Sequence, residues 1–422
     1  MILHQVTPAS IPVDVRLRPP GSKSITIRAL AVAALASGTS VLHDPLHAED
    51  TEAMSRAVQG FGAALDQQGE PWRVTGVGGR VTAPPEPIDA GESGLTARIA
   101  IAIAALAPGT TVIRGRGRLP ERPLGGLVQA LASCGVEMRT NKGGLPAEVA
   151  GRGHIAGGEV TVDCTESSQF ATAIMLIAPL FDDSVRLLLT GLTGSSGYLE
   201  VSRQVMVSFG AQVEPIEGGF EIRPSGYRGA SFTVEPDASA AVYPLVAAAI
   251  TAGRAEIEGL HIDSSQPDLR LADALEEMGC QVTAGEEAMV LTGPERLNPI
   301  DTNMAEAPDA ALALAVACLF ANGESRIGGL ASLRHKESDR LRSLVETFTE
   351  LGARARVEGD TLVVTPGRLR SAVIDSHGDH RVAMSLALVG LRVPGVAIAR
   401  PEVVAKTWPG YWSVLERMVS GG

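Results

Sequence analysis

Residues 22–45 read SKSITIRALAVAALASGTSVLHDP, and this stretch contains the pattern from which the fold is inferred. A short polar start is followed by an almost wholly apolar segment, a glycine and a run rich in β-branched residues. An apolar segment without a polar face is typical of a buried helix, and the run after the glycine favours a strand. The stretch therefore predicts a buried inner helix followed by a strand.

The same order of features recurs five more times, with starts about 70 to 75 residues apart. Two matching Ala-rich helices could arise by chance, whereas six at near-constant spacing indicate a repeat. The five further copies read ESGLTARIAIAIAALAPGTTVIRG (92–115), SSQFATAIMLIAPLFDDSVRLLLTG (167–191), DASAAVYPLVAAAITAGRAEIEGL (237–260), PDAALALAVACLFANGESRIGGL (308–330) and GDHRVAMSLALVGLRVPGVAIARP (378–401).

A second, amphipathic helix lies out of phase with the first in these copies, as in LRLADALEEMG at 269–279 and SLVETFTELG at 343–352. Its amphipathic pattern predicts an outer helix. Each such helix ends at a glycine before a strand, which is typical of a helix C-terminus. The five glycines are Gly62, Gly135, Gly210, Gly279 and Gly352.

The fold class is therefore α/β, with six units that make about two cores of three. Prolines in RPPG at 18–21 and VEPDA at 234–238 mark candidate joints. If the chain crosses between domains at both, one domain comprises residues 21–236. The other comprises residues 1–20 together with 237–422.

Composition narrows the class of protein. Apolar residues make up 45% and charged residues 20% of the chain, which is typical of globular proteins. The net charge of −12 argues against nucleic-acid binding. We expect a soluble cytoplasmic protein for three reasons. The four cysteines are scattered, as is typical of reduced thiols. The sequence has neither a signal-peptide pattern nor an apolar run long enough for a membrane helix. The eight histidines form no convincing metal set.

Basic residues beside the inner helix starts suggest a function. Ser24, Ser93, Ser168, Asp237, Asp309 and Asp379 mark these starts and are ordinary N-cap types. Cations at the start of a helix oppose the helix dipole. Three of these helix starts are nevertheless flanked by basic residues, namely Lys23, Arg28, Arg98 and Arg381. The start of an outer helix is flanked by Arg334, His335, Lys336 and Arg340. A bound anion would reconcile both facts. Two carboxylates among the cations, Asp309 and Glu337, are candidates for a general base and a general acid.

Seven motifs in order along the chain resemble those of the 3-phosphoshikimate 1-carboxyvinyltransferase family, also called EPSP synthases. They are PGSKSITIR (20–28), RLPERP (118–123), SSQF (167–170), PDAA (308–311), KESDR (336–340), GDHRVAMS (378–385) and KTWP (406–409). The resemblance implies an enolpyruvyl transferase-like fold of two domains, each built from three βαβαββ units. It also implies transfer of the enolpyruvyl group of phosphoenolpyruvate to the 5-hydroxyl of shikimate 3-phosphate in aromatic amino acid (chorismate) biosynthesis.

The resemblance also implies roles for individual residues. Phosphoenolpyruvate would be held by Lys23, Arg122, Arg340, Arg381 and Lys406, with Gly94 in its pocket. Shikimate 3-phosphate would be held by Ser24, Arg28, Ser167, Ser168, Ser195 and Lys336, with Gln169 between the two substrates and Tyr198 facing them. Asp309 would take the hydroxyl proton, and Glu337, assisted by Lys23, would protonate the methylene carbon. No metal or organic cofactor is implied, and we expect a monomer whose partners are these two small molecules, with no nucleic acid or membrane.

Two positions depart from the family pattern in the segment GESGLTAR. Glu92 stands where the family usually has Asn, and Leu95 stands where it has Thr. If Leu95 presses the helix start toward the phosphoenolpyruvate pocket, the longer inhibitor glyphosate should bind more weakly. If Leu95 points into the core, the pocket is unaltered.

Three other functions are compatible with parts of the pattern. The sister enzyme that acts on UDP-N-acetylglucosamine carries Lys-Asn where this chain has Lys23 and Ser24, and a cysteine near 115–122 where this chain has none. A paralogous carboxyvinyltransferase acting on another hydroxylated substrate would keep the phosphate contacts. A non-catalytic phosphometabolite-binding protein would have no reason to keep Asp309 and Glu337 together.

Overall fold

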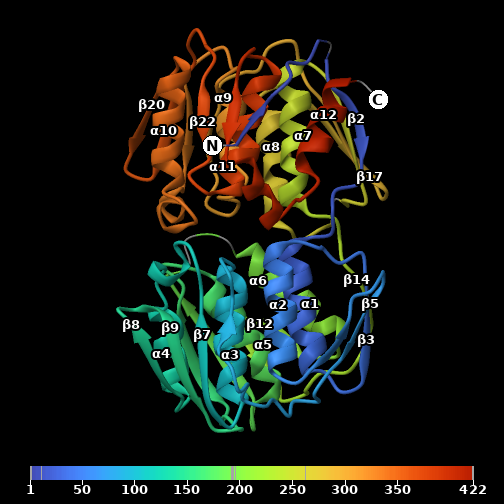
Figure 1. Ribbon diagram of the computed structural model, residues 1–422, viewed down its shortest axis with the longest axis vertical. Coiled ribbons are helices and arrows are strands. Elements are labelled where there is room, and N and C mark those ends of the chain that lie inside the picture. The colour runs from blue at the N-terminus through green and yellow to red at the C-terminus, as the bar shows by residue number, and fades with distance from the viewer. Residues whose placement is uncertain (1, 11, 192–193, 195, 262, 421–422) are drawn as a thin grey trace. The chain divides into compact units, whose positions relative to one another are not determined.

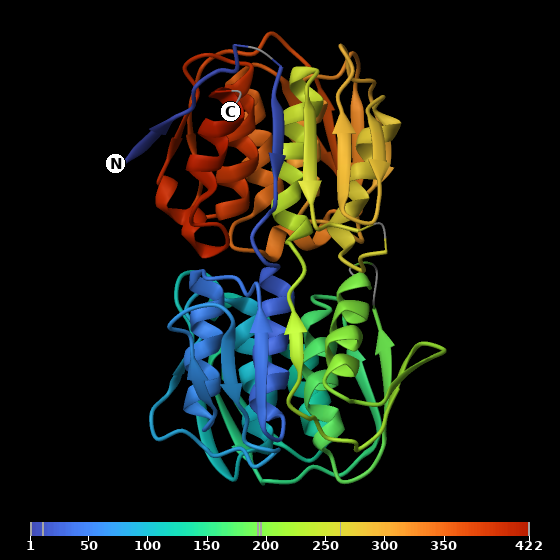
Figure 2. The ribbon, with the colours of Figure 1, turned by 90° about the vertical axis from the view of Figure 1, so that its right-hand side faces the viewer.

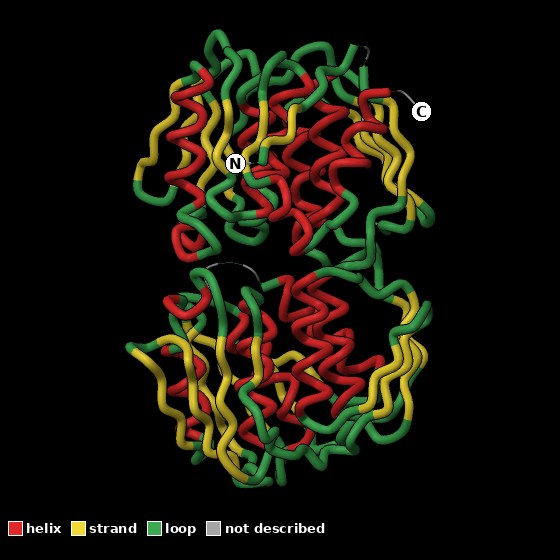
Figure 3. The backbone as a smooth tube through the Cα atoms, viewed as in Figure 1, coloured by secondary structure: helices red, strands yellow, loops and turns green. Residues whose placement is uncertain are grey.

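The structure is a computed structural model that describes residues 2–10, 12–191, 194, 196–261 and 263–420. It separates into two compact units: unit 1 comprises Met1–Pro20 and Pro236–Gly422, and unit 2 comprises Gly21–Glu235 (Figure 1). Each unit has its own hydrophobic core. Within each unit, helices lie between sheets that face outward (Figure 3).

Unit 2 contains three inner helices, which are almost wholly buried, and three amphipathic outer helices. The inner helices are α1 (Lys23–Leu35), α3 (Gly94–Leu106) and α5 (Gln169–Ile177). The outer helices are α2 (Glu49–Gly60), α4 (Gly125–Ser133) and α6 (Gly197–Ser208). Ala, Ile and Leu fill the inner helices on every side, so these helices can be stable only when they are surrounded by protein.

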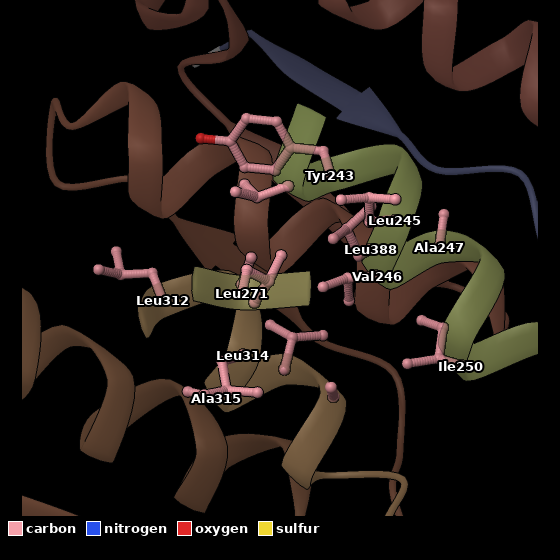
Figure 4. Packing of buried hydrophobic residues seen from close by; sticks show 14 of the residues in the cluster. Tyr243, Leu245, Val246, Ala247, Ile250, Leu271, Leu312, Leu314, Ala315 and Leu388 are labelled. Carbon is pink, nitrogen blue, oxygen red and sulfur yellow. The ribbon is translucent and has the colours of Figure 1, made fainter. Parts of the chain in front are cut away.

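Unit 1 repeats this arrangement. Its inner helices are α7 (Ala238–Thr251), α9 (Ala311–Cys318) and α11 (His380–Ala387). Its outer helices are α8 (Arg270–Glu277), α10 (Arg340–Leu351) and α12 (Tyr411–Ser420). Side chains of α7, α8 and α9 interdigitate in the core, and the hydroxyl of Tyr243 points away from the apolar side chains (Figure 4).

In the part of the chain that the structure describes, each unit has three small sheets. Those of unit 2 have the strand orders β14-β3-β5-β4, β6-β7-β9-β8 and β10-β11-β13-β12. Their bounds are β14 (Ser231–Thr233), β3 (Thr39–His43), β5 (Trp72–Thr75), β4 (Ala64–Asp66), β6 (Ile88–Asp89), β7 (Gly109–Arg114), β9 (Gly144–Gly151), β8 (Glu137–Asn141), β10 (Gly158–Asp163), β11 (Val185–Thr190), β13 (Gly219–Ile222) and β12 (Val213–Ile216).

The sheets of unit 1 have the orders β2-β15-β17-β16, β18-β19-β21-β20 and β22-β23-β1. Their bounds are β2 (Asp14–Leu17), β15 (Arg254–Glu258), β17 (Ala288–Thr292), β16 (Gln281–Ala284), β18 (Asp301–Asn303), β19 (Ser325–Gly328), β21 (Thr361–Thr365), β20 (Arg354–Glu358), β22 (Val373–Asp375), β23 (Ala397–Ala399) and β1 (Leu3–Gln5).

All six sheets follow one topology. The first strand is parallel to the second, and the second is antiparallel to the third, as in β10, β11 and β13. In the last sheet the N-terminal strand β1 takes the third place, antiparallel to β23. Strand β2 runs alongside β15 even though more than two hundred residues separate them in the sequence (Figure 2). The α/β class and the sixfold repeat predicted from the sequence are confirmed.

Candidate active site

Six charged residues that the sequence placed at the site lie together in unit 1, and we call them the unit 1 cluster. Asp309 immediately precedes the first turn of α9, and the segment between the 3₁₀ helix Ala331–His335 and α10 carries two more members. The others lie at the start of α10, in the first turn of α11 and at the end of the 3₁₀ helix Pro401–Lys406. The cluster consists of Asp309, Lys336, Glu337, Arg340, Arg381 and Lys406.

The Asp309 carboxylate contacts three cations. Its Oδ1 accepts a hydrogen bond from Arg340 Nη1 at 2.8 Å and lies 3.4 Å from Lys336 Nζ, and its Oδ2 lies 3.2 Å from Arg381 Nε. Burial alone would raise the pKa of Asp309, but the charges of Lys336, Arg381 and Arg340 outweigh it and hold this pKa well below its usual range. Asp309 is therefore ionised. An anionic ligand that engaged these cations would raise its pKa and make it a stronger base.

Glu337 is the second carboxylate of the cluster. Its Oε2 accepts a hydrogen bond from Arg340 Nη2 at 3.0 Å, and its Oε1 accepts one from Lys406 Nζ at 3.2 Å. One guanidinium group, that of Arg340, thus contacts both Asp309 and Glu337. The arrangement fixes two ionisable groups close to each other, as acid and base catalysis of one reaction requires.

Asp379 belongs to the same network, although the sequence predicted only a helix cap there. Its Oδ2 accepts from Arg340 Nε at 2.7 Å and from Ser338 Oγ at 3.0 Å, and its Oδ1 accepts from Arg340 Nη2 at 3.1 Å and from the Arg381 backbone N–H at 2.9 Å. Asp379 is fully buried. A carboxylate next to His and Arg in GDHR, in a chain with several cations beside its helix starts, was the signal that could have identified it.

In unit 2, Lys23 opens α1 and lies beside α2. Its Nζ is 3.3 Å from Oδ2 of Asp50, a residue in the first turn of α2 that the sequence did not single out. The next residue, Ser24, accepts a hydrogen bond through its carbonyl from Arg28 Nη1 at 2.9 Å. The first turn of α1 therefore carries Lys23 and accepts a hydrogen bond from the Arg28 guanidinium group.

Arg28 is 2% exposed and is surrounded by neutral groups. Burial lowers the pKa of Arg28 to about 10. Its guanidinium donates to the Ser24 carbonyl (2.9 Å), Ser202 Oγ (2.8 Å), Thr172 Oγ1 (3.3 Å) and the Tyr198 carbonyl (3.3 Å). None of these four acceptors is charged. A buried cation is costly unless it is paired with an anion, so an anionic ligand next to Arg28 would be stabilised.

The start of α5 carries three more predicted residues. Ser167 Oγ accepts a hydrogen bond from the Gln169 backbone N–H at 3.3 Å, and Ser168 stands at the cap position. The side-chain oxygen of Gln169 is buried without a hydrogen-bond partner in the described part of the chain.

Tyr198, in the first turn of α6, has its ring centroid 5.9 Å from Arg28 Cζ. Ser195 lies outside the described residues.

Gly94 and Arg122 lie against each other. Gly94 is the first residue of α3, and Arg122 follows the 3₁₀ helix Leu119–Glu121. A Cβ atom at position 94 would lie 2.5 Å from Arg122 Nη1 and 2.9 Å from Arg98 Nη1. Any other residue at position 94 would require these guanidinium groups to shift. The neighbouring Leu95 is 6% exposed and packs in the hydrophobic core of unit 2. Its side chain therefore points into the core, which was one of the two orientations considered from the sequence.

Not all of the predicted helix starts are capped by the predicted side chains. Ser93, Asp237 and Asp379 accept hydrogen bonds from the first turns of α3, α7 and α11, as predicted. The other three helices begin at or next to the predicted residues, but these residues make no side-chain cap hydrogen bond. Ser24 is the second residue of α1, Ser168 makes no side-chain cap bond, and Ala310 rather than Asp309 caps α9. Asp309 instead contacts cations, because three positive charges attract a carboxylate more strongly than one backbone N–H does.

Among the described residues, no group of three or more His, Cys, Asp or Glu side chains could hold a metal ion. None of the helices described is long and apolar enough to span a membrane.

Comparison with known proteins identifies relatives along the whole chain. The family model of EPSP synthase (3-phosphoshikimate 1-carboxyvinyltransferase) matches residues 8–415. The 3-phosphoshikimate 1-carboxyvinyltransferase of Methanoculleus marisnigri is 39% identical over 410 residues, which cover 96% of each chain. That of Trichormus variabilis is 34% identical over 97% of each chain. The EPSP synthase structure from Acinetobacter baumannii superimposes with a TM-score of 0.83 at 24% identity and covers 99% of this chain and 98% of its own, a likeness of fold.

Proposed function

The chain belongs to the EPSP synthase family, and we propose that it transfers the enolpyruvyl group of phosphoenolpyruvate to the 5-hydroxyl of shikimate 3-phosphate. The products are 5-enolpyruvylshikimate 3-phosphate and inorganic phosphate. Together they contain all the atoms of the two substrates, so neither an oxidant nor a reductant is needed.

The charge of the unit 1 cluster is the observation that carries the proposal. Four cations, Lys336, Arg340, Arg381 and Lys406, surround two carboxylates at the starts of three helices and the end of a 3₁₀ helix. Two anionic substrates repel each other, and bringing them together requires several cations. A protein that only bound a phosphorylated metabolite would need the cations but not Asp309 and Glu337.

Each residue then has a proposed role. Phosphoenolpyruvate is held by Lys23, Arg122, Arg340, Arg381 and Lys406, with Gly94 in its pocket. Shikimate 3-phosphate is held by Ser24, Arg28, Ser167, Ser168, Ser195 and Lys336, with Gln169 between the substrates and Tyr198 facing them. The neutral surroundings of Arg28 and the buried oxygen of Gln169 support these assignments in unit 2.

The reaction proceeds by addition and elimination. Asp309 accepts the proton of the 5-hydroxyl group while the hydroxyl oxygen forms a bond to C2 of phosphoenolpyruvate. Glu337, assisted by Lys23, delivers a proton to C3, which yields a tetrahedral intermediate. Return of a proton from C3 to Glu337 and cleavage of the C2–O bond, with phosphate as the leaving group, then restore the double bond. Because the substrates engage the cations that depress the pKa of Asp309, this carboxylate becomes more basic when it is needed.

Phosphate release is the test of this function. Purified protein should release inorganic phosphate only when phosphoenolpyruvate and shikimate 3-phosphate are both present. UDP-N-acetylglucosamine, offered as the alternative acceptor, should support no release. Release with that acceptor, or with phosphoenolpyruvate alone, would reject the proposed acceptor or the proposed reaction.

We further propose that the protein works as a monomer in the cytoplasm. All four cysteines are free thiols, and burial raises the pKa of Cys164 to about 11 and those of Cys280 and Cys318 to about 12. Such thiols suit a reducing compartment. Light scattering should give a mass close to 43.8 kDa, and twice that mass would show a dimer.

A further inference from the structure

Arg98 lies next to Arg122, and its guanidinium group donates hydrogen bonds to two backbone carbonyls. It occupies the second turn of the inner helix α3 and is 1% exposed. Arg122 is only partly buried. The two guanidinium groups meet at Gly94, where a Cβ atom would lie 2.9 Å from Arg98 Nη1 and 2.5 Å from Arg122 Nη1. Two like charges are thus held side by side.

The hydrogen bonds of Arg98 join two segments that are far apart in the sequence. Its Nη1 donates to the carbonyl of Gly94 at 3.0 Å, and its Nη2 donates to the carbonyl of Pro123 at 3.1 Å. Gly94 is the first residue of α3, and Pro123 directly follows Arg122. The planar guanidinium group therefore fixes the backbone on both sides of the place where Arg122 lies.

The position of Arg98 is itself fixed by packing. Its Cζ lies 5.9 Å from the ring centroid of Phe170, which is fully buried in the core of unit 2. An arginine in this position can donate to two carbonyl groups at once, because its N–H groups form a rigid planar fork. A lysine at the same place has one ammonium group on a flexible stem and lacks that fork.

We propose that Arg98 is a positioning residue that sets the place of the Arg122 guanidinium. This role rests on the proposed function, in which Arg122 holds phosphoenolpyruvate. Arg98 holds the carbonyls of Gly94 and Pro123 in place, and this directs Arg122 to the anion.

The kinetic test uses Arg98→Lys, which keeps the charge and removes the fork. We expect KM for phosphoenolpyruvate to rise roughly 10- to 100-fold, the range that corresponds to losing a hydrogen bond to a charged group. KM for shikimate 3-phosphate should stay within about twofold. Arg114→Lys, an exposed arginine on β7 in the same unit, is the matched control and should leave both constants unchanged. An equal rise in both KM values would overturn the proposal.

A double-mutant cycle separates positioning from a general loss of structure. If Arg98 acts through Arg122, then Arg98→Lys combined with Arg122→Lys should be no worse than Arg122→Lys alone. Losses that multiply would mean that Arg98 acts independently of Arg122. If Arg98→Lys fails to fold, Arg98→Gln, which removes the charge and keeps donor N–H groups, takes its place in the cycle.

A crystal structure of the folded Arg98 variant provides a readout that does not depend on activity. The Arg122 guanidinium should leave its place against Gly94, and an unchanged Arg122 would refute the positioning role. Turnover of the unmodified protein is measured separately. Its absence would count against the proposed function alone, because the place of Arg122 in the crystal would still decide the role of Arg98.

Discussion

Asp309 and Glu337 are the two residues on which turnover should depend most. Asp309→Asn and Glu337→Gln keep the size of each side chain and remove its ability to exchange a proton. Each should lower kcat by roughly 10²- to 10⁴-fold, the usual loss when a positioned acid or base is removed. Steady-state kinetics with both substrates measures this effect.

Glu346→Gln is the control for these two variants. Glu346 is an exposed carboxylate on α10 that pairs with Arg342, away from the unit 1 cluster. The kcat of the Glu346→Gln variant should equal that of the wild type. If either active-site variant retained a near-normal kcat with an unaltered fold, that residue would have no part in proton transfer.

The low pKa of Asp309 also predicts how stability depends on pH. Because its pKa is depressed in the folded protein, its ion pairs stabilise the fold at every pH above its unfolded pKa, about 3.9. This stabilisation is lost as the pH falls from there through the folded pKa. The difference in Tm between wild type and Asp309→Asn should therefore be the same at pH 6 and pH 8 and should shrink below about pH 4. A difference that already shrinks between pH 8 and pH 6 would contradict the assignment.

Leu95 should affect stability rather than inhibitor selectivity. Its side chain is buried in the core of unit 2, so Leu95→Thr places a hydroxyl among apolar groups and should cost about 2–4 kcal/mol. The ratio of the glyphosate Ki to the KM for phosphoenolpyruvate should not change. Urea unfolding and inhibition kinetics measure the two effects, and a fall in that ratio would show that Leu95 shapes the pocket after all.

At the scale of single residues, the sequence indicated where charged residues of the site lie but not which of them form ion pairs with each other. The positions of Asp309, Lys336, Glu337 and Arg340 in motifs with several cations pointed to an anion site. Asp379 and Asp50 were missed as partners because each contacts a cation far away in the sequence, and spacing along the chain carries no information about such contacts. The roles assigned to these side chains stay predictions until the variants are measured.

At the scale of elements, the glycines after the outer helices were informative because a left-handed backbone is a local requirement. Gly62, Gly135, Gly210, Gly279 and Gly352 all have positive φ, between 76° and 103°. The apolar inner helices were likewise predictable from composition. The order of strands in the sheets was not, since β2 pairs with β15 and β14 with β3 over long separations.

Two of these glycines give a matched test. Gly352→Ala and Gly210→Ala both force alanine into a left-handed conformation, at about 1–2 kcal/mol each. At position 352 the new Cβ would also lie 2.7 Å from the Arg368 carbonyl oxygen, whereas at 210 it would meet nothing within 4 Å. Gly352→Ala should therefore destabilise the protein more, as measured by urea unfolding. Equal losses would mean that the contact with Arg368 relaxes freely.

At the scale of the whole molecule, six copies of one topology give two units, each with its own core. The buried inner helices begin at the predicted substrate residues in every copy except the fourth. Repetition thus supplies many helix starts with similar geometry, and these starts differ mainly in their polar side chains. The family, the fold class and the reaction were all accessible from ordered motifs, because most of these motifs combine a helix start with charged residues.

The central claim is that this protein joins phosphoenolpyruvate to shikimate 3-phosphate, and a coupled measurement tests it most directly. Phosphate release is followed together with mass spectrometry of the ring product, with each substrate alone and with both. The account predicts release only with both substrates, in a one-to-one ratio with the enolpyruvyl product, and its loss in Asp309→Asn. No release with both substrates, or release without formation of the enolpyruvyl product, would contradict it.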